Sequence, residues 1–222
     1  TTRARRARSP QGEGGRLRDE LVRAADRLLE RTGDEAGLTL RAVAREAGIA
    51  APSVYLHFAG RDELVRAVLD RHFAGFREAL QTGIAAAGDD PAAQLRAGCL
   101  AYCRFGLTHP GPYRVMFGNR TAYVPTGNFD EVPGADTFGS LVDGVAGVIA
   151  AGLAPPGDPL RLATGVWTAL HGIVTLRAAV PMFPWPPVED LIEDILVGLV
   201  GIPPRPPSVP TETDGDSAPG TD

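Results

Sequence analysis

The chain has 222 residues, a formal net charge of −5 and no lysine, so that Arg supplies all 22 of its basic side chains. The longest nearly uninterrupted apolar run, 145–154, is far shorter than the roughly 20 residues that span a bilayer, and the Arg-rich start lacks the apolar segment of a secretory signal. Cys99 and Cys103 are the only cysteines and make no disulfide framework, so we expect a reduced, cytoplasmic protein that does not enter a membrane.

Apolar residues recur with the period of an α-helix along the chain, and no segment alternates as a β-strand does. The expected helices of the N-terminal part cover 15–31, a short stretch that begins after Thr39 as its N-cap, a second short stretch over 51–57, and a long stretch from about 62 to 84. Those of the remainder cover 91–107, 112–117, 138–152, 159–180 and 188–200. The sequence therefore predicts an all-α fold.

Three segments have the composition of loops or tails. Residues 1–14 form a polar, Arg-rich arm that we expect to be mobile, and residues 118–134 contain Gly, Asn and Pro as in a long loop. The tail 203–222 is Pro-rich and polar, which is typical of disorder. We therefore predict a head at 15–61 and a body at 62–202 between this arm and this tail.

The segment 38–69 has the features of a helix-turn-helix. Gly48 separates two short helices and can adopt the left-handed backbone that such a turn needs, while Ala44 is small enough for the two helices to cross closely. Val54 and Phe58 are placed to anchor the second helix inward. Such an arrangement presents its second helix to the major groove of DNA.

The distribution of charge agrees with a nucleic-acid partner for the N-terminal part. Residues 1–18 carry a net charge of +5 and residues 1–70 carry +2, which leaves −7 for residues 71–222. Only the head and its arm can approach a phosphate backbone without long-range repulsion. The arm is interpreted equally well as a contact to the minor groove or phosphates and as an inert solvated end.

Within this segment, a run of positions fits the pattern T-x-R-x-[IV]-A-x-x-A-G-[VI]-[SA]-x-x-[ST]-[LVI]-Y-x-H-F-x-x-[KR]-[DE]-x-L without a gap. The matching residues are Thr39, Arg41, Val43, Ala44, Ala47, Gly48, Ile49, Ala50, Ser53, Val54, Tyr55, His57, Phe58, Arg61, Asp62 and Leu64. The segment thereby closely resembles the tetracycline-repressor (TetR) family of transcription regulators. Ala50 replaces a commoner Ser, which removes a hydroxyl that could cap the second helix.

The resemblance implies a three-helix DNA-binding head followed by a helical ligand-binding and dimerisation body. It implies that Thr39 and Tyr55 bind phosphates, with help from Arg61 and the N-terminus of the long helix. The residues that it places at or near base edges are Ala51, Pro52, Ser53 and His57. Because the second helix has no Arg or Lys to bind guanine, we expect readout to rely on Arg41, on thymine methyl groups and on DNA shape.

A second resemblance lies in the body. The segment Tyr102–Gly118 (YCRFGLTHPGPYRVMFG), followed by Trp167-x-x-x-His171-Gly172, looks like the family's subgroup with a Trp-His-Gly (WHG) C-terminal region, whose members fit ligand-responsive repressors. Trp167 and His171 lie four residues apart on an apolar stripe, so they either line an effector pocket or form a core pair. The expected effector-binding residues, although such a set more often forms simple core, are Tyr102, Phe105, Met116, Phe117, Phe138, Trp167 and His171.

Four glycines occur in the expected helix 138–152, at positions 139, 144, 147 and 152. Each costs up to about 1 kcal/mol of helix stability relative to Ala. Such a concentration indicates either close packing against a neighbouring helix or a deformable element, and the sequence does not distinguish the two.

These observations predict a homodimeric repressor that a small apolar ligand releases from a palindromic operator. The partners expected are double-stranded DNA with an inverted repeat, the effector and a second copy, whose helices 159–180 and 188–200 would pair in a four-helix interface. We expect no metal, no cofactor and no enzymatic activity. The alternatives are an activator or architectural DNA-binding protein without an effector, and a metabolite-binding protein or enzyme whose DNA-binding head is vestigial.

Overall fold

The computed structural model of the protein describes residues 13–32, 37–118 and 132–205. Within these ranges the chain forms helices and turns and no β-strand, which confirms the expected all-α fold. The expected arm up to residue 12, most of the expected loop 118–134 and the tail from residue 206 lie outside the described residues.

The described helices lie close to the ranges expected from the sequence. They are α1 (Glu13–Thr32), α2 (Leu40–Glu46), α3 (Ala51–Val54), α4 (Arg61–Ala85), α5 (Pro91–Thr108), α6 (Pro110–Phe117), α7 (Ala135–Ala150), α8 (Pro159–Ala179) and α9 (Val188–Ile195), the last continued by a π-helical turn at Leu196–Val200. Asp90 and Asp158 start α5 and α8 by accepting backbone N–H groups, each with Pro in the first turn of the helix.

The second short helix ends earlier than expected, at Val54 instead of residue 57. Ala50 is its N-cap residue and provides no side-chain hydrogen bond, so the first turn lacks the stabilisation that a hydroxyl would give. The next residues form a tight turn in which the N–H groups of His57 and Phe58 both donate to the carbonyl of Val54, at 2.9 and 3.0 Å. This turn directs the Phe58 ring into the core of the head.

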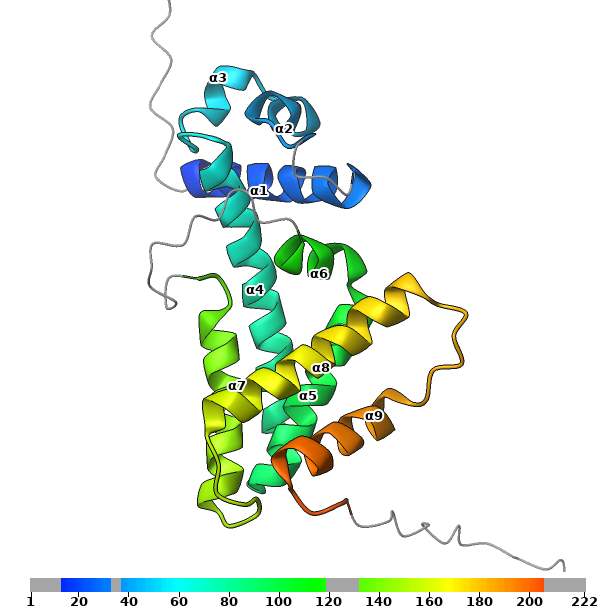
Figure 1. Ribbon diagram of the computed structural model, residues 1–222. Helices are drawn as coiled ribbons and strands as arrows, with labels where there is room; N and C mark the ends of the chain where they lie inside the picture. The colour runs from blue at the N-terminus through cyan, green and yellow to red at the C-terminus, as the bar shows by residue number, and fades with distance from the viewer. Residues whose placement is uncertain (1–12, 33–36, 119–131, 206–222) are drawn as a thin grey trace, which may run out of the picture.

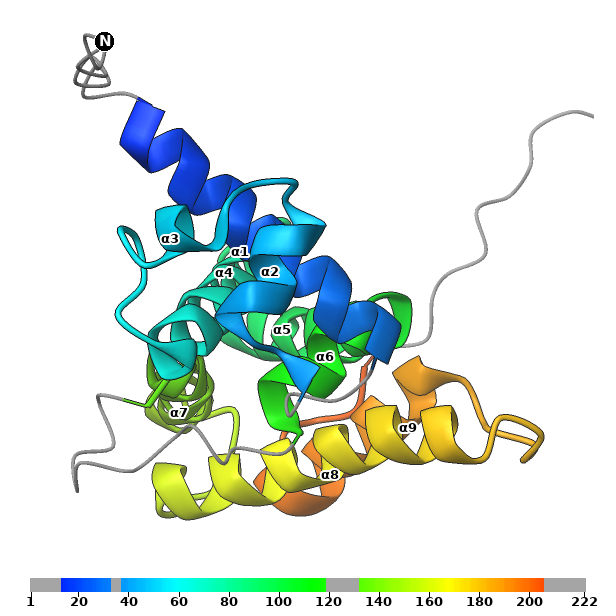
Figure 2. The same ribbon diagram turned by 90° about the horizontal axis from the view of Figure 1, so that it is seen from above.

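The helices form a small head on a larger body. Helices α1 to α3 lie together at one end, and α4 runs from them along the length of the body (Figure 1). Helix α5 packs along α4, while α7 and α8 pack against α5 and against each other. Viewed from above, α1 crosses over the ends of α4, α5 and α6 (Figure 2), and α6 contacts both α1 and α4. Helix α6 therefore lies between head and body.

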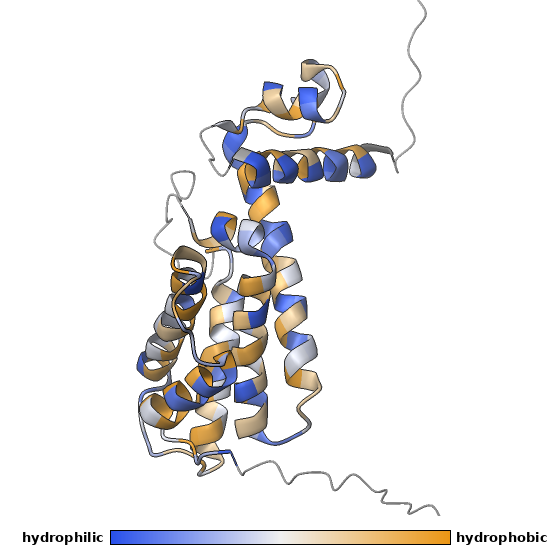
Figure 3. Cartoon of the chain, turned by 90° about the vertical axis from the view of Figure 1, so that its right-hand side faces the viewer, coloured by the Kyte–Doolittle hydropathy of each residue, from blue (hydrophilic) through white to orange (hydrophobic). Residues whose placement is uncertain are grey.

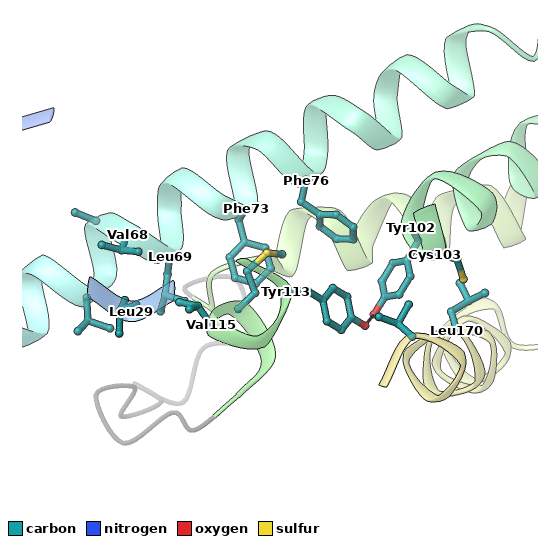
Figure 4. Packing of buried hydrophobic residues seen from close by; sticks show 14 of the residues in the cluster. Leu29, Val68, Leu69, Phe73, Phe76, Tyr102, Cys103, Tyr113, Val115 and Leu170 are labelled. Atoms are coloured by element: carbon teal, nitrogen blue, oxygen red, sulfur yellow. Dashed lines mark hydrogen bonds between the residues drawn. The ribbon is translucent and has the colours of Figure 1, made fainter. Parts of the chain in front are cut away.

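A continuous hydrophobic core joins the two parts. Apolar and polar residues alternate along the helices, as Figure 3 shows, and the apolar sides of neighbouring helices face one another. At the junction, Leu29 of α1, Leu69 of α4 and Val115 of α6 gather in one cluster (Figure 4). A buried polar contact lies nearby, because His72 Nε2 of α4 is 2.7 Å from Asp26 Oδ1 of α1. None of the described helices has the length and apolar character to cross a bilayer.

Candidate functional site

The turn between α2 and α3 has the backbone that the sequence predicts. Gly48 adopts a φ of +69°, and the N–H of Ile49 donates to the carbonyl of Ala44 at 2.9 Å. A side chain at position 48 would meet no neighbour, so the requirement for glycine is conformational rather than steric. Ala44 is buried where the helices cross.

Helix α3 and the turn after it project from the head. Val54 is fully buried and Phe58 is 1% exposed, so both anchor this segment inward as predicted. On the opposite side, the side chain of Tyr55 is 55% exposed and that of Leu56 is 83% exposed. The arrangement leaves a convex surface available to a partner.

The eight expected DNA-binding residues all have accessible side chains. Thr39, Arg41, Pro52 and Tyr55 are exposed, and Ala51, Ser53, His57 and Arg61 are partly exposed. They come from α2, from α3 with its following turn, and from the first residue of α4. The three elements therefore bring these residues to one end of the molecule.

Thr39 and Arg61 are held by contacts within the head. The hydroxyl oxygen of Thr39 accepts the N–H of Ala42 at 3.1 Å, which caps α2 and leaves the O–H free to donate to a phosphate oxygen. Arg61 Nε donates to the carbonyl of Leu38 at 3.2 Å, one residue before Thr39. This bond ties the start of α4 to the start of α2 and fixes the spacing between the two residues.

The N-terminus of α4, which the resemblance assigns to phosphate binding, already carries acidic side chains. Asp62 and Glu63 lie in its first turn, and Glu63 Oε2 accepts the N–H of Ala59 at 2.7 Å. Carboxylates at this end complement the helix dipole. They also reduce the attraction of this helix end for a phosphate, so we expect Thr39 and Tyr55 to be the main phosphate-binding side chains.

The body contains a cavity of about 610 Å³ between α4, α5, α7 and α8. Four of its residues follow one face of α4 from Phe73 to Ile84, which is a rise of about 16 Å at 1.5 Å per residue. The cavity is therefore elongated along the body. Its walls are mainly apolar and include Phe73, Phe76, Leu80, Ile84, Leu95, Phe117, Leu141 and Leu170.

Glycines of α7 form part of this cavity. Gly144 and Gly147 both line it, and a Cβ atom at Gly144 would lie 3.4 Å from Leu95. A Cβ atom at Gly147 would have no neighbour within 4 Å. Close packing, one of the two explanations left open by the sequence, thus applies at Gly144, which contacts α5, whereas Gly147 faces open space; a deformable α7 stays a prediction.

Four of the seven expected effector-binding residues line the cavity: Tyr102, Phe117, Phe138 and Trp167. The other three lie behind its wall. The ring of Phe105 packs on that of Phe76 with centroids 5.0 Å apart, and Met116 is buried in the core. His171 contacts the ring of Phe117 and forms a hydrogen bond with Tyr113.

A chain of hydrogen bonds leads away from the cavity wall. The hydroxyls of Tyr102 and Tyr113 are 2.7 Å apart, and the Tyr113 hydroxyl is 2.7 Å from His171 Nδ1. These bonds join Tyr102 of α5 through Tyr113 of α6 to His171 of α8. Burial raises the pKa of both tyrosines and lowers the pKa of His171, so all members are neutral near pH 7.

The sequence analysis missed Tyr113, which lies at the centre of this chain. Tyr113 belongs to α6, whose Phe117 lines the cavity and whose Val115 reaches the cluster that contains Leu29 of α1. Its only sequence signal is a position within the segment Tyr102–Gly118. Helix α6 therefore connects the cavity wall to the head, in addition to the long helix α4.

Comparison with known proteins identifies the family from two parts of the chain. The family profile described as bacterial regulatory proteins, tetR family, matches residues 21–68, and that of the tetracyclin repressor-like C-terminal domain matches residues 95–199. An HTH-type transcriptional regulator of Mycobacterium tuberculosis is 31% identical over 160 residues, which are 72% of this chain and 69% of that protein. The chain belongs to the TetR family.

Solved structures share the fold of this chain. A protein of unknown function from Rhodococcus sp. RHA1 is 31% identical, with a TM-score of 0.69 over 83% of this chain and 95% of that one. The structure of AibR in complex with isovaleryl coenzyme A and operator DNA has the same fold at 17% identity, with a TM-score of 0.62 over 85% of this chain and 99% of that one.

The TetR-family assignment makes this protein a transcriptional regulator with a helix-turn-helix head, as the sequence predicts. The head profile covers α2, α3 and the start of α4, and the second profile begins at Leu95 and ends at Leu199. The cavity thus lies mostly within the part that matches the C-terminal domain. The Trp-His-Gly subgroup stays a prediction.

Proposed function

We propose that the protein is a homodimeric repressor that binds an inverted-repeat operator and is released by a small apolar ligand. In this proposal residues 15–61 bind DNA and residues 62–202 bind the ligand and the second copy. The exposed residues of α2 and α3 contact the operator, and the ligand occupies the cavity between α4, α5, α7 and α8. The apolar character of the cavity wall supports this choice of ligand.

The observation that carries the proposal is that α4 belongs to both sites. Its first turns place Leu64 and Val65 in the core of the head, and its later turns, from Phe73 to Ile84, form a wall of the cavity. A ligand that displaces this wall also displaces the head. In a dimer, a small rotation of each head changes the distance between two recognition segments, which must be about 34–36 Å to fit successive major grooves.

Exposed apolar side chains support the second copy as a partner. On α8 they include Leu160 and Leu176, and Val180, Phe183 and Leu199 follow near α9. Exposed apolar residues concentrated on adjacent helices mark interaction surfaces. A two-fold pairing of this face would place both heads at the same end of the dimer.

The proposal is tested with the full chain and a random duplex library. Selection of bound DNA is expected to enrich an inverted repeat. Saturation with the neutral fluorophore N-phenyl-1-naphthylamine, which reports its own binding by fluorescence, is expected to weaken the affinity for that repeat by roughly 5- to 150-fold, the usual range of allosteric coupling. Enrichment of no sequence, or an unchanged operator affinity at full occupancy of the fluorophore, would contradict it.

The role of Tyr55 is tested by Tyr55→Phe. Its exposed hydroxyl is expected to donate to a phosphate, so its loss should weaken binding by about 10- to 150-fold, as for a hydrogen bond to a charged group worth about 1.5–3 kcal/mol. Measured by fluorescence anisotropy, the loss should be similar for the operator and for variants at each base position. Thermal stability should not change, because the side chain is solvent-exposed. A loss confined to one base position would show that Tyr55 reads a base instead.

A further inference from the structure

The cavity is elongated, and nearly all of its described lining residues are uncharged. Those residues include no Arg, Lys or His, and Asp143 is the one that carries a formal charge. Asp143 is exposed and lies on α7 three residues after Ser140, and Thr164 of α8 also lines the cavity. The single charge of this wall is therefore negative and lies at its solvent-exposed rim.

The hydroxyl groups of the wall already donate to partners within the protein. Ser140 Oγ donates to the carbonyl of Asp136 at 3.0 Å, and Thr164 Oγ1 donates to the carbonyl of Leu160 at 2.8 Å. Such bonds within a helix leave a hydroxyl oxygen as acceptor but no proton for a ligand.

Other polar side chains of the wall are hydrogen-bonded within the protein or are uncharged. The Tyr102 hydroxyl belongs to the hydrogen-bond chain that ends at His171, and the Trp167 indole N–H is a neutral donor. Gln94 Nε2 donates to the carbonyl of Gly88 at 2.6 Å, which leaves the second amide N–H as a neutral donor at the far end of the cavity. Burial raises the pKa of the Cys99 thiol to about 12, so this group is also neutral.

An anion placed in this cavity would lose its hydration, and the described wall offers it no cation and only isolated neutral donors such as the second amide N–H of Gln94. The desolvation of an ionised carboxylate is strongly unfavourable unless charged partners or several hydrogen bonds replace water. Arg77, the one Arg of α4 between Phe73 and Ile84, is paired with Asp136. A neutral molecule with apolar surface along its length avoids this cost and gains the burial of that surface.

We propose that this cavity binds an elongated, uncharged apolar molecule with at most one neutral polar end, and excludes carboxylates and other anions of the same length. The selectivity rests on the proposed function, in which the cavity is the effector site. This selectivity distinguishes the protein from regulators whose effectors are acidic, because the described cavity wall has no cationic group to neutralise a carboxylate.

The test compares decanol with decanoate at pH 8, by displacement of N-phenyl-1-naphthylamine from the full-length protein. Decanol is expected to bind at least about 100-fold more tightly than decanoate. Along the series from butanol to decanol, affinity should rise about fourfold per added methylene, since each buried methylene contributes about 0.8 kcal/mol. As pH falls toward 5, the apparent affinity of decanoate should rise, because the fraction of protonated acid increases.

Two carboxylate variants test the contribution of Asp143, which lies at the rim of the cavity. Asp143→Asn is expected to raise the affinity for decanoate several-fold and so to narrow the difference between decanol and decanoate. Asp190→Asn removes an exposed carboxylate of α9 outside the cavity and should change neither affinity. Equal or tighter binding of decanoate at pH 8, or an affinity that stops rising at hexanol, would overturn the proposal.

The fluorophore separates this inference from the function on which it rests. If the fluorophore binds the full chain and Gly147→Leu abolishes that binding, the cavity is a ligand site whatever charge it prefers. A preference for decanoate would then refute only the selectivity. If neither the fluorophore nor decanol binds, the ligand cavity and its selectivity are both wrong.

Discussion

Replacement of Gly147 by leucine is expected to abolish ligand binding while the protein keeps its fold and its affinity for DNA. A Cβ atom at this position of α7 has no neighbour within 4 Å, and the position lines the cavity. The larger side chain therefore extends into space that the ligand would occupy. Affinity for N-phenyl-1-naphthylamine should fall by about 5- to 150-fold or more, because overpacking of a filled site costs about 1–3 kcal/mol or more.

The same substitution should stabilise the unliganded protein. Glycine inside a helix is about 0.8–1.0 kcal/mol less favourable than Ala, and leucine is close to Ala on this scale. The urea-unfolding midpoint of Gly147→Leu should therefore rise as its ligand binding disappears. DNA binding should persist at every fluorophore concentration, so that the variant is a repressor that does not respond.

Gly139→Leu is the matched control for this result. Gly139 lies on the same helix, a Cβ atom there also has no neighbour within 4 Å, and the position is outside the cavity wall. It should gain stability in the same way and retain ligand binding. If both variants lose binding equally, the effect comes from a stiffer α7 and the position of the ligand would have to be revised.

The sequence was informative about the head because its signals are local. Thr39 caps α2, Gly48 turns the chain at positive φ, and Phe58 packs inward, each as the spacing of the motif predicts. These features depend on residues within a few positions of one another. The early end of α3 at Val54 was not predicted, because it depends on how the turn to Phe58 is closed by two bonds to a single carbonyl.

The body was predicted less completely because its site depends on side chains that are distant in the sequence. Aromatic residues at helical spacing did not reveal which of them border a void: Phe117 lines the cavity, whereas Met116 beside it is buried. The link from Tyr113 to His171 spans 58 positions and joins α6 to α8. The glycines of α7 indicated an unusual helix, but only the packing around that helix shows that Gly144 contacts α5 and that Gly147 faces open space.

The second large effect is expected from Phe58→Ala, which should unfold the head and abolish DNA binding. Phe58 is 1% exposed, and the guanidinium of Arg18 of α1 lies 4.9 Å from its ring centroid. Truncation of a buried Phe costs about 3–5 kcal/mol, and the loss of the cation–π contact adds about 0.5–1 kcal/mol. Because α3 is a single turn held by Val54 and Phe58, few other apolar contacts remain to keep it in place.

Hydrogen exchange and ligand binding together show which part of the Phe58→Ala variant is unfolded. Amides of α2 and α3 should lose protection in Phe58→Ala, while the fluorophore still binds the body, since the cavity lies at the other end of α4. Leu56→Ala truncates an exposed side chain of the same turn and should change stability by less than about 0.5 kcal/mol. If Phe58→Ala loses both fluorophore binding and the hydrogen-exchange protection of α2 and α3, head and body unfold as one unit. The core through Leu69 and Val115 would then couple the unfolding of the head to that of the body.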